Sequence, residues 1–242
     1  MPGKDRETNM SIAENIRRVR QEIAEAAAAA GRCPEEITLV GASKMNDAAA
    51  CREAVAAGID VLGENRVQEL LQKYAEDAYV GAPLHFIGHL QRNKVRQIVG
   101  KVDLIQSVGS LELLAEIQRC AEKMELRQDI LLEVNIGGEE SKSGFAPEAV
   151  YAAAEQAVQM PNVRVRGLMT IPPVEVEPGD STQYFEKVRA LYVDINSNLF
   201  HNELECLSMG MSGDFAQAIA AGATMVRIGT AIFGARHYTG RT

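Results

Sequence analysis

A lysine at the end of a short apolar run is the first residue of this sequence that could do chemistry. Residues 37–44 read Ile-Thr-Leu-Val-Gly-Ala-Ser-Lys, a pattern typical of a strand buried on both faces. Alternation along a strand puts Lys44 on the side of Thr38, Val40 and Ala42, small residues that leave room beside it. Partial loss of hydration there favours the neutral amine, the form that attacks carbonyl carbons. The alternative is a lysine that has left the strand and lies in solvent, where most lysines are found.

Two loops near the other end of the chain combine glycine with hydroxyl side chains. The first, Ser-Met-Gly-Met-Ser-Gly-Asp, begins at Ser208, and the second, Gly-Thr-Ala-Ile-Phe-Gly, begins at Gly229. Ser208 and Ser212 offer hydroxyl groups, and Ser212 is placed to cap a following helix. Gly229 and Thr230 offer backbone amides and a hydroxyl at the start of a short helix, which is a typical phosphate site. Ordinary turn and cap chemistry would use the same residue types.

Arg227 lies in the apolar run just before the second loop. Alternation places Arg227 and Met225 on one side, so Arg227 points inward if Val226 and Ile228 face helices. A buried guanidinium needs an acceptor, which could be an internal carboxylate or the ring nitrogen of a cofactor. The lysine, the two loops and the arginine match the aldehyde, phosphate and ring nitrogen of pyridoxal 5'-phosphate (PLP), the vitamin B6 cofactor.

The fold must bring Lys44 close to these C-terminal loops. From residue 37 onward, strand-like and helix-like stretches alternate in about eight units, which implies a parallel sheet. The expected strands span residues 37–43, 60–62, 84–88, 104–108, 130–136, 163–169, 204–207 and 224–228. The expected helices span residues 47–57, 64–77, 92–99, 111–124, 147–159, 182–196 and 213–221, and a short one begins at 232.

We therefore predict an α/β fold, a single (β/α)8 TIM-type barrel with an extra N-terminal helix. That helix has capping-box spacing at residues 11–14 and ends near Gly31. Residues 1–10 are expected to be a flexible tail, and residues 11–242 one PLP-binding barrel domain. Functional groups of such barrels gather at the C-terminal ends of the strands, with phosphate after strands 7 and 8. An open doubly wound sheet is the alternative, although no Gly-x-Gly-x-x-Gly follows the first strand.

The composition argues against several classes of function. The net charge of -8 is unlike that of a nucleic-acid binder, no apolar run could cross a membrane, and residues 1–10 have no signal-peptide core. The four cysteines are far apart, as expected for buried or semi-buried free thiols in a reducing cytoplasm. They are Cys33, Cys51, Cys120 and Cys206. The four histidines lack the spacing of metal ligands. They are His85, His89, His201 and His237.

From the first helix to Gly234 the sequence resembles the YggS/PROSC family of pyridoxal phosphate homeostasis proteins. The motifs that carry the resemblance are Val-Gly-Ala-Ser-Lys at 40–44, Gly-Glu-Asn at 63–65, His-Phe-Ile-Gly-His-Leu-Gln-Arg-Asn-Lys at 85–94, Val-Asn-Ile at 134–136, Ser-Lys-Ser-Gly at 141–144, Arg-Gly-Leu-Met at 166–169, Leu-Ser-Met-Gly-Met-Ser at 207–212 and Val-Arg-Ile-Gly-Thr-Ala-Ile-Phe-Gly at 226–234.

This resemblance implies a barrel similar to the N-terminal domain of alanine racemase. It also implies a Schiff base on Lys44 and Arg227 at the pyridine nitrogen, with Asn65 near the ring. Phosphate binding falls to Ser208, Gly229 and Thr230. The chain departs from the family after the lysine, where Met-Asn-Asp stands in place of a small residue followed by proline. The shape of that loop is therefore not implied.

Four further cations have two readings each. Arg92, Lys94 and Arg96 fall in the first turns of an expected helix, where cations oppose the helix dipole. They could hold a second anion at the barrel mouth or form a solvated helix face. Lys142 lies in the loop after the fifth strand and could meet incoming cofactor or be a mobile surface lysine.

The final question is whether bound PLP does chemistry in this protein. Related racemases and decarboxylases add a β-rich domain, for which this chain has no residues left. An arginine at the ring nitrogen also disfavours ring protonation and weakens the cofactor as an electron sink. We expect a cytoplasmic, monomeric PLP carrier that serves apo PLP-dependent enzymes without robust turnover. A racemase-like PLP enzyme, and a barrel enzyme whose lysine binds a keto substrate, are the alternatives.

Overall fold

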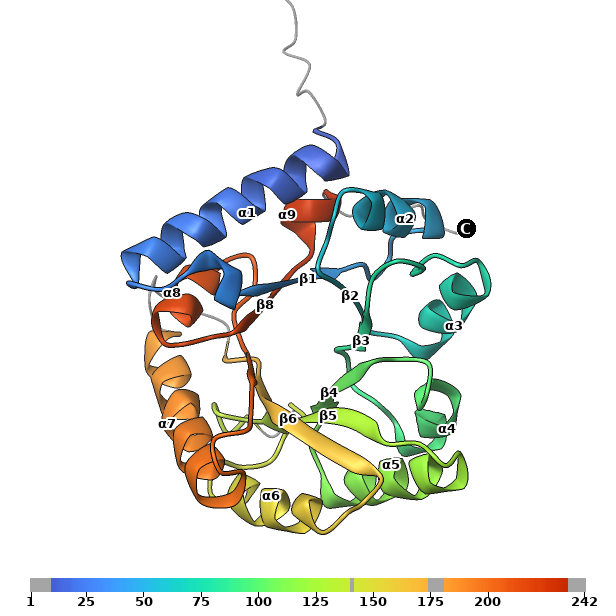
Figure 1. The fold of residues 1–242 in the computed structure, drawn as a ribbon, viewed down its shortest axis with the longest axis vertical. Coiled ribbons are helices and arrows are strands. Elements are labelled where there is room, and N and C mark those ends of the chain that lie inside the picture. The colour runs from blue at the N-terminus through green and yellow to red at the C-terminus, as the bar shows by residue number, and fades with distance from the viewer. Residues whose placement is uncertain (1–9, 140–141, 174–180, 235–242) are drawn as a thin grey trace, which may run out of the picture.

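The structure is a computed structural model that describes residues 10–139, 142–173 and 181–234. Eight parallel strands close into a barrel in chain order, and β8 returns to pair with β1 (Figure 1). The predicted (β/α)8 barrel is therefore confirmed. The strands are β1 (Thr38–Ala42), β2 (Val61–Glu64), β3 (Leu84–Phe86), β4 (Leu104–Val108), β5 (Gln128–Val134), β6 (Val163–Thr170), β7 (Cys206–Ser208) and β8 (Met225–Ile228). The expected tail at residues 1–10 lies outside the described residues except for Met10, so the domain bounds stay a prediction.

The helices form a ring outside the strands (Figure 1). They are α1 (Ile12–Ala29), α2 (Ala48–Ala56), α3 (Val67–Ala75), α4 (Val95–Ile98), α5 (Leu111–Lys123), α6 (Val150–Val158), α7 (Thr182–Leu199), α8 (Phe215–Ala220) and α9 (Thr230–Phe233). Two short 3-10 turns, Pro34–Glu36 and Arg92–Lys94, precede β1 and α4. Within the described part of the chain, no helix has both the length and the apolar character needed to span a bilayer.

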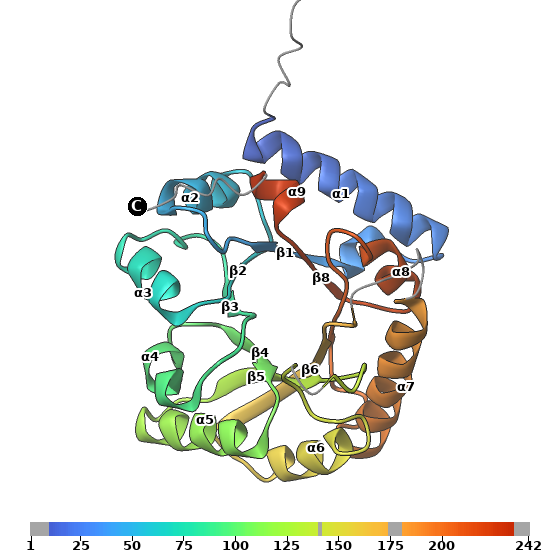
Figure 2. The same ribbon diagram turned by 180° about the vertical axis from the view of Figure 1, so that it is seen from behind.

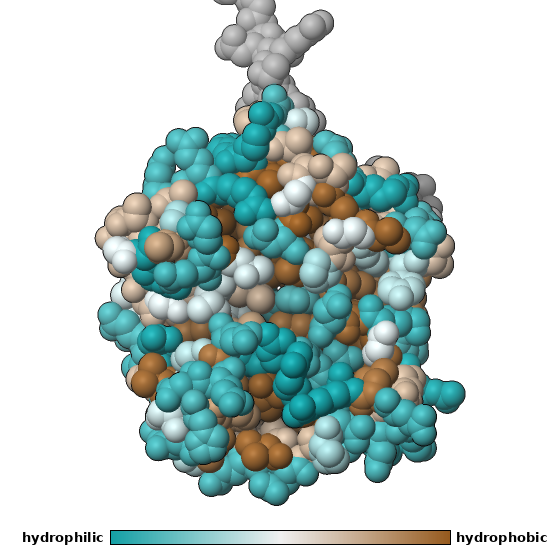
Figure 3. All heavy atoms as spheres, viewed as in Figure 1, coloured by the Kyte–Doolittle hydropathy of each residue, from teal (hydrophilic) through white to brown (hydrophobic). Residues whose placement is uncertain are grey.

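Apolar side chains form two cores on opposite sides of the strands. The larger core lies between the barrel wall and the helices and includes Leu39, Val226 and Ile228. The smaller core fills the barrel with one residue from each of six strands: Val40, Val61, Leu104, Leu131, Met169 and Met225. This split confirms the alternation predicted for the first and last strands. On the face shown in Figure 3, hydrophobic residues are scattered among hydrophilic ones.

Several element boundaries differ from the prediction, and three of them matter for the analysis of side chains below. Glu64, expected to open a helix, is the last residue of β2, and α3 begins at Val67. The helix expected over residues 92–99 is a 3-10 turn followed by the four-residue α4. Strand β7 begins at Cys206 rather than at residue 204, because the backbone of Leu204 is bonded to Tyr192 and Asn196 of α7 instead of a neighbouring strand.

Helix α1 precedes the repeating units and packs across α8 and α9, as Figures 1 and 2 both show. Its predicted capping box is present, with Ser11 and Glu14 bonding each other's backbone. Near its start, the buried Asn15 donates from Nδ2 to the carbonyl of Ile232 at 2.9 Å. Beyond its end, Arg32 donates to carbonyls at the end of α8 and before β8. The N-terminal helix therefore fixes the last two units of the barrel.

Replacing Asn15 should weaken this link between the two ends of the chain. We expect Asn15→Ala to lower the free energy of unfolding by about 1–3 kcal/mol, because the Ile232 carbonyl loses a buried donor. Urea unfolding followed by circular dichroism measures the effect. Gln21→Ala, an exposed change on the same helix, is the control and should shift the value by less than about 0.5 kcal/mol. Equal unfolding free energies for the two variants would contradict this role of Asn15.

Candidate functional site

A cavity of about 590 Å³ opens where the C-terminal ends of the strands meet. Its lining comes from the segments after β1, β2, β3, β6, β7 and β8. The lining residues that carry polar groups or free backbone are Lys44, Asn46, Asp47, Asn65, Ser212, Gly213, Arg227, Gly229, Thr230 and Gly234. Five of the six residues predicted from the sequence thus surround one space. The sixth, Ser208, lies deeper in the barrel and is fully buried.

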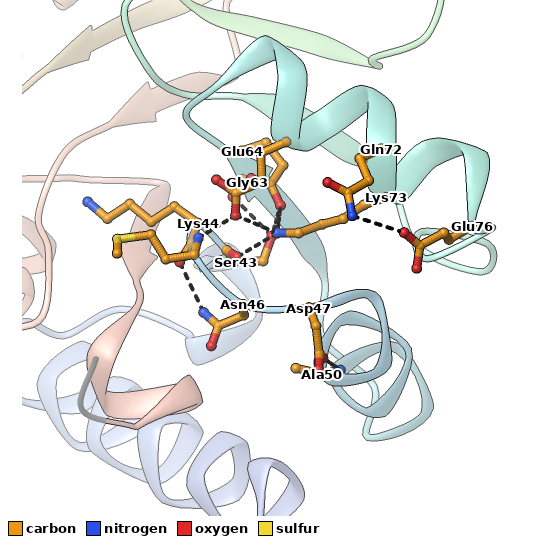
Figure 4. Close-up of polar contacts among 12 residues, drawn as sticks. Ser43, Lys44, Asn46, Asp47, Ala50, Gly63, Glu64, Gln72, Lys73 and Glu76 are labelled. Carbon is orange, nitrogen blue, oxygen red and sulfur yellow. Dashed lines mark hydrogen bonds and ion pairs between the residues drawn. The ribbon is translucent and has the colours of Figure 1, made fainter. Parts of the chain in front are cut away.

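Lys44 stands two residues beyond the end of β1 and is half-buried. Its side chain extends away from the neighbouring polar residues Glu64 and Lys73, which lie behind the strand (Figure 4). Met45 follows in the left-handed region with φ of 64°, which turns the chain sharply toward α2. The strand and this turn together place the lysine on the cavity wall, as the alternation of the sequence predicts.

Arg227 points into the barrel and is only 4% exposed. Its guanidinium donates from Nη1 to Ser208 Oγ at 2.7 Å and from Nη2 to the carbonyl of Thr170 at 3.0 Å. Burial lowers the pKa of Arg227 to about 10, although Glu133 and Asp214 oppose the shift. The arginine therefore remains a fixed cation at neutral pH and lines the floor of the cavity.

Ser208 supports Arg227 rather than facing the cavity. The sequence places it in the loop after the seventh strand, whereas the structure makes it the last residue of β7, paired with Met169 of β6. Its hydroxyl accepts from Arg227 and donates to Gln106 Oε1 at 2.7 Å. Gln106 in turn contacts Nδ1 of His85 at 2.9 Å. Burial lowers the pKa of His85 to about 4, so this chain of hydrogen bonds ends on a neutral imidazole.

The two glycine-containing loops meet at one side of the cavity. Gly229 and Thr230 open α9, where the first amides have no acceptor within the helix. In the loop after β7, the Asp214 carboxylate accepts from the amide of Met211 at 2.6 Å and fixes the turn. Asp214, not Ser212, is the N-cap residue of α8, so the predicted cap was wrong. Ser212 and Gly213 are exposed instead and line the same cavity as Gly229 and Thr230.

Glu133 is a site residue that the sequence analysis missed. It is 8% exposed, follows Leu131 on the inward face of β5, and lines a smaller cavity of about 230 Å³ together with Asn65. Within the described residues, neither Glu133 Oε2 nor Asn65 Oδ1 has a hydrogen-bond partner. Burial raises the pKa of Glu133 to about 7, against the attraction of Arg227. The inward alternation of β5 was the signal that could have revealed it.

Two of the four other predicted cations, Arg92 and Lys142, lie around a second cavity. Arg92 is exposed and lines a cavity of about 700 Å³ with His89 and Lys142. Lys142 is half-buried, donates to the carbonyl of Pro172 and pairs with Glu139. Lys94 is half-buried and Arg96 is exposed. The structure does not decide whether these cations bind an anion or incoming cofactor or are surface side chains. Lys142 is nevertheless held in place by Pro172 and Glu139.

Histidines and cysteines add no further site. Among the described residues no group of three or more possible ligands could hold a metal ion, and His237 lies outside them. His201 is an exposed turn residue with positive φ. All four cysteines are free thiols, as predicted, but Cys33 is exposed rather than buried.

Comparison with known proteins gives a consistent result. The family model for the alanine racemase N-terminal domain matches residues 10–237. The pyridoxal phosphate homeostasis protein of Aquifex aeolicus is 46% identical over 229 residues, which cover 95% of this chain and 100% of that protein. The structure of PipY from Synechococcus elongatus with PLP bound is 34% identical with a TM-score of 0.81, covering 93% of this chain and 100% of PipY. Alanine racemase of Clostridium difficile shares the fold alone, at 17% identity and a TM-score of 0.71, over 94% of this chain and 58% of the racemase.

The raised pKa of Glu133 predicts a pH-dependent difference in stability. The folded state holds the Glu133 proton up to about pH 7, whereas an unfolded glutamate loses it near 4.5, so ionisation destabilises the fold as pH rises between these values. In cofactor-free protein, Glu133→Gln should match the original chain near pH 4, below both pKa values. It should exceed it by about 2–3 kcal/mol in unfolding free energy near pH 8. Urea unfolding at both pH values measures this, and a pH-independent difference would contradict the assignment.

Proposed function

The chain belongs to the family of pyridoxal phosphate homeostasis proteins, and on that premise we propose that it binds PLP and acts in intracellular PLP homeostasis and delivery. One observation carries the proposal. Lys44, from the first strand, and Arg227, Gly229 and Thr230, from the last, line the same cavity. These are an amine, a buried cation and the amides of a helix start, which suit an aldehyde, a ring nitrogen and a phosphate.

The cavity residues fit this cofactor in three respects. A volume of about 590 Å³ lies within the range of small-molecule sites. Asn65 carries a buried carbonyl oxygen with no hydrogen-bond partner within the described residues, so its amide can meet a polar ring substituent. A Cβ atom at Gly229 would approach the carbonyl oxygen of Ala42 at 3.3 Å, so the glycine keeps this wall open beside Lys44.

Each residue has a distinct part in this proposal. PLP supplies an aldehyde that forms a Schiff base with a primary amine, and Lys44 is the amine that would hold it. Gly229 and Thr230, with Ser212 and Gly213 beside them, would bind the phosphate through amides and hydroxyls. Arg227 would donate to the ring nitrogen while Ser208 and Thr170 hold the guanidinium in place. Ser208 therefore contributes through Arg227 rather than by touching the phosphate itself.

The state of Arg227 favours a carrier over an enzyme. A guanidinium with a pKa of about 10 donates a hydrogen bond but does not give up its proton at neutral pH, so it leaves a ring nitrogen unprotonated. An unprotonated ring withdraws electrons weakly, which disfavours racemisation and decarboxylation. We therefore propose a protein without robust turnover, working as a monomer in the cytoplasm, where its free thiols would persist.

Covalent trapping tests the proposed role of Lys44. We expect purified protein mixed with PLP to turn yellow, and borohydride to bleach it and leave a pyridoxyl group on Lys44, located by peptide mass spectrometry. Lys44→Ala should lose the adduct, whereas Lys101→Ala, a change at an exposed lysine in the turn before β4, should keep it. Colourless protein that cannot be loaded, or an adduct on another residue, would refute the assignment.

Transfer and turnover assays separate a carrier from a racemase-like enzyme. Holoprotein, expected to have the mass of one chain by light scattering, should activate an apo PLP-dependent enzyme even when a trap removes free PLP. The same holoprotein should racemise or decarboxylate amino acids no faster than PLP alone. Robust turnover would support the racemase-like alternative, and activation that the trap abolishes would contradict direct delivery.

A further inference from the structure

A buried polar cluster lies directly behind Lys44. Its centre is Lys73 of α3, a lysine that is only 4% exposed. The Lys73 ammonium contacts Glu64 Oε1 at 2.7 Å, Glu69 Oε1 at 2.9 Å and the carbonyl oxygen of Ser43 at 2.9 Å (Figure 4). Ser43 Oγ also donates to Glu64 Oε1, at 2.6 Å. The cluster thus joins the end of β1 to the unit formed by β2 and α3.

This cluster binds the backbone on both sides of Lys44. On the preceding side, the carbonyl of Ser43 accepts from Lys73. On the following side, the amide of Met45 donates to the carboxylate of Glu69. The two peptide groups that flank the lysine are therefore held by side chains of one helix, α3.

The bond from Met45 to Glu69 acts at a strained residue. Met45 has φ of 64°, a conformation that is unfavourable for a residue with a Cβ atom and persists only where its surroundings impose it. Met45 itself is 48% exposed, so side-chain packing does little to impose this conformation. The Glu69 carboxylate on the Met45 amide helps to hold it, together with two bonds from Asn46, whose amide donates to the Ser43 carbonyl and whose Nδ2 donates to the Lys44 carbonyl, both at 3.1 Å.

Charge balance explains why Glu69 can stay in this position. Burial acts to lower the pKa of Lys73, but the carboxylates of Glu64 and Glu69 outweigh it and the pKa is raised. The two acidic side chains therefore favour the charged form of Lys73, while burial raises the pKa of Glu64. Glu64 is also held by the Tyr79 hydroxyl at 3.1 Å. With Lys73 anchored on Glu64, the Glu69 carboxylate is fixed where it meets the Met45 amide.

We propose that Glu69, held by Lys73, is a positioning residue that fixes the direction of the Lys44 side chain into the cavity. A cluster that served stability alone would have no need to engage both peptide groups beside the lysine. The proposal rests on the proposed function, since it assigns Glu69 and Lys73 to the amine that would hold PLP. It predicts that loosening the Met45 amide weakens cofactor binding without moving the attachment point.

Substitutions on α3 and at its C-cap test this role. Glu69→Ala removes the acceptor for the Met45 amide, and Glu69→Gln keeps an acceptor oxygen but no charge. Glu76→Ala is the matched control, because Glu76 caps the same helix, bonds Gln72 and makes no contact with the Lys44 segment (Figure 4). The dissociation constant of PLP is measured by absorbance titration. In cofactor-free protein, acylation of Lys44 relative to Lys101 is followed over pH by mass spectrometry.

We expect Glu69→Ala to weaken PLP binding about tenfold and to change the pH profile of Lys44 acylation, with the borohydride adduct still on Lys44. Glu69→Gln should stay within about threefold of the original chain and Glu76→Ala should match it. If Glu69→Ala does not fold, Glu69→Asp, whose side chain is one methylene shorter, replaces it in the test. We expect Glu69→Asp to weaken PLP binding several-fold. Equal dissociation constants and equal acylation profiles for the Glu69 and Glu76 variants would overturn the proposal, even if melting temperatures differ.

The two proposals can fail separately. An original chain that forms no adduct on Lys44 would refute the proposed function. The acylation profile of the cofactor-free variants would then still report whether Glu69 controls the lysine. An adduct on Lys44 in every variant, with unchanged affinity and unchanged acylation, would leave the proposed function standing and remove Glu69 from it.

Discussion

The pairing of the first strand with the last is the constraint on which the site depends. Val40 of β1 lies opposite Arg227 of β8, so the turn that carries Lys44 and the loop that carries Gly229 and Thr230 leave the barrel side by side. Neither segment could form the cavity alone, because each contributes only one end of it. Closure also separates two regions of the barrel. Apolar residues fill its interior, and polar residues gather at the C-terminal ends of the strands.

The polar layer above the apolar core is where the fold places its buried charges. Arg227, Glu133 and Lys73 are each more than nine-tenths buried. Arg227 bonds the hydroxyl of Ser208 and the carbonyl of Thr170, and Lys73 bonds the carboxyl groups of Glu64 and Glu69. For Glu133, burial raises the pKa to about 7. Buried charge that lacks such compensation would destabilise the barrel by several kcal/mol.

Sequence periodicity was sufficient for the barrel and for most of the candidate site. Residues 37–44 and 224–228 are short, largely apolar runs, so the side on which Lys44 and Arg227 lie followed from the two-residue alternation of a strand. Glu133 and Lys73 were missed for physical reasons. Each becomes significant only through a partner distant in sequence or through an element boundary that periodicity does not locate accurately. Glu64, for example, was predicted to begin a helix, and this prediction concealed its pairing with Lys73. Ser208 shows the same limit, because a shift of one residue at the end of β7 moved its hydroxyl from the loop into the barrel.

The hydrogen bond between Asn15 of α1 and Ile232 of α9 also implies an order in which contacts form during synthesis. Asn15 emerges from the ribosome early and its acceptor, the carbonyl of Ile232, emerges near the end. Closure between β1 and β8 has the same long sequence separation, so the barrel can close only after the last strand has been made. A nascent chain that lacks β8 presents Lys44 as an ordinary amine, without the cation or the amides that complete the cavity. Lys44 therefore shares a cavity with Arg227, Gly229 and Thr230 only when the whole barrel has been made.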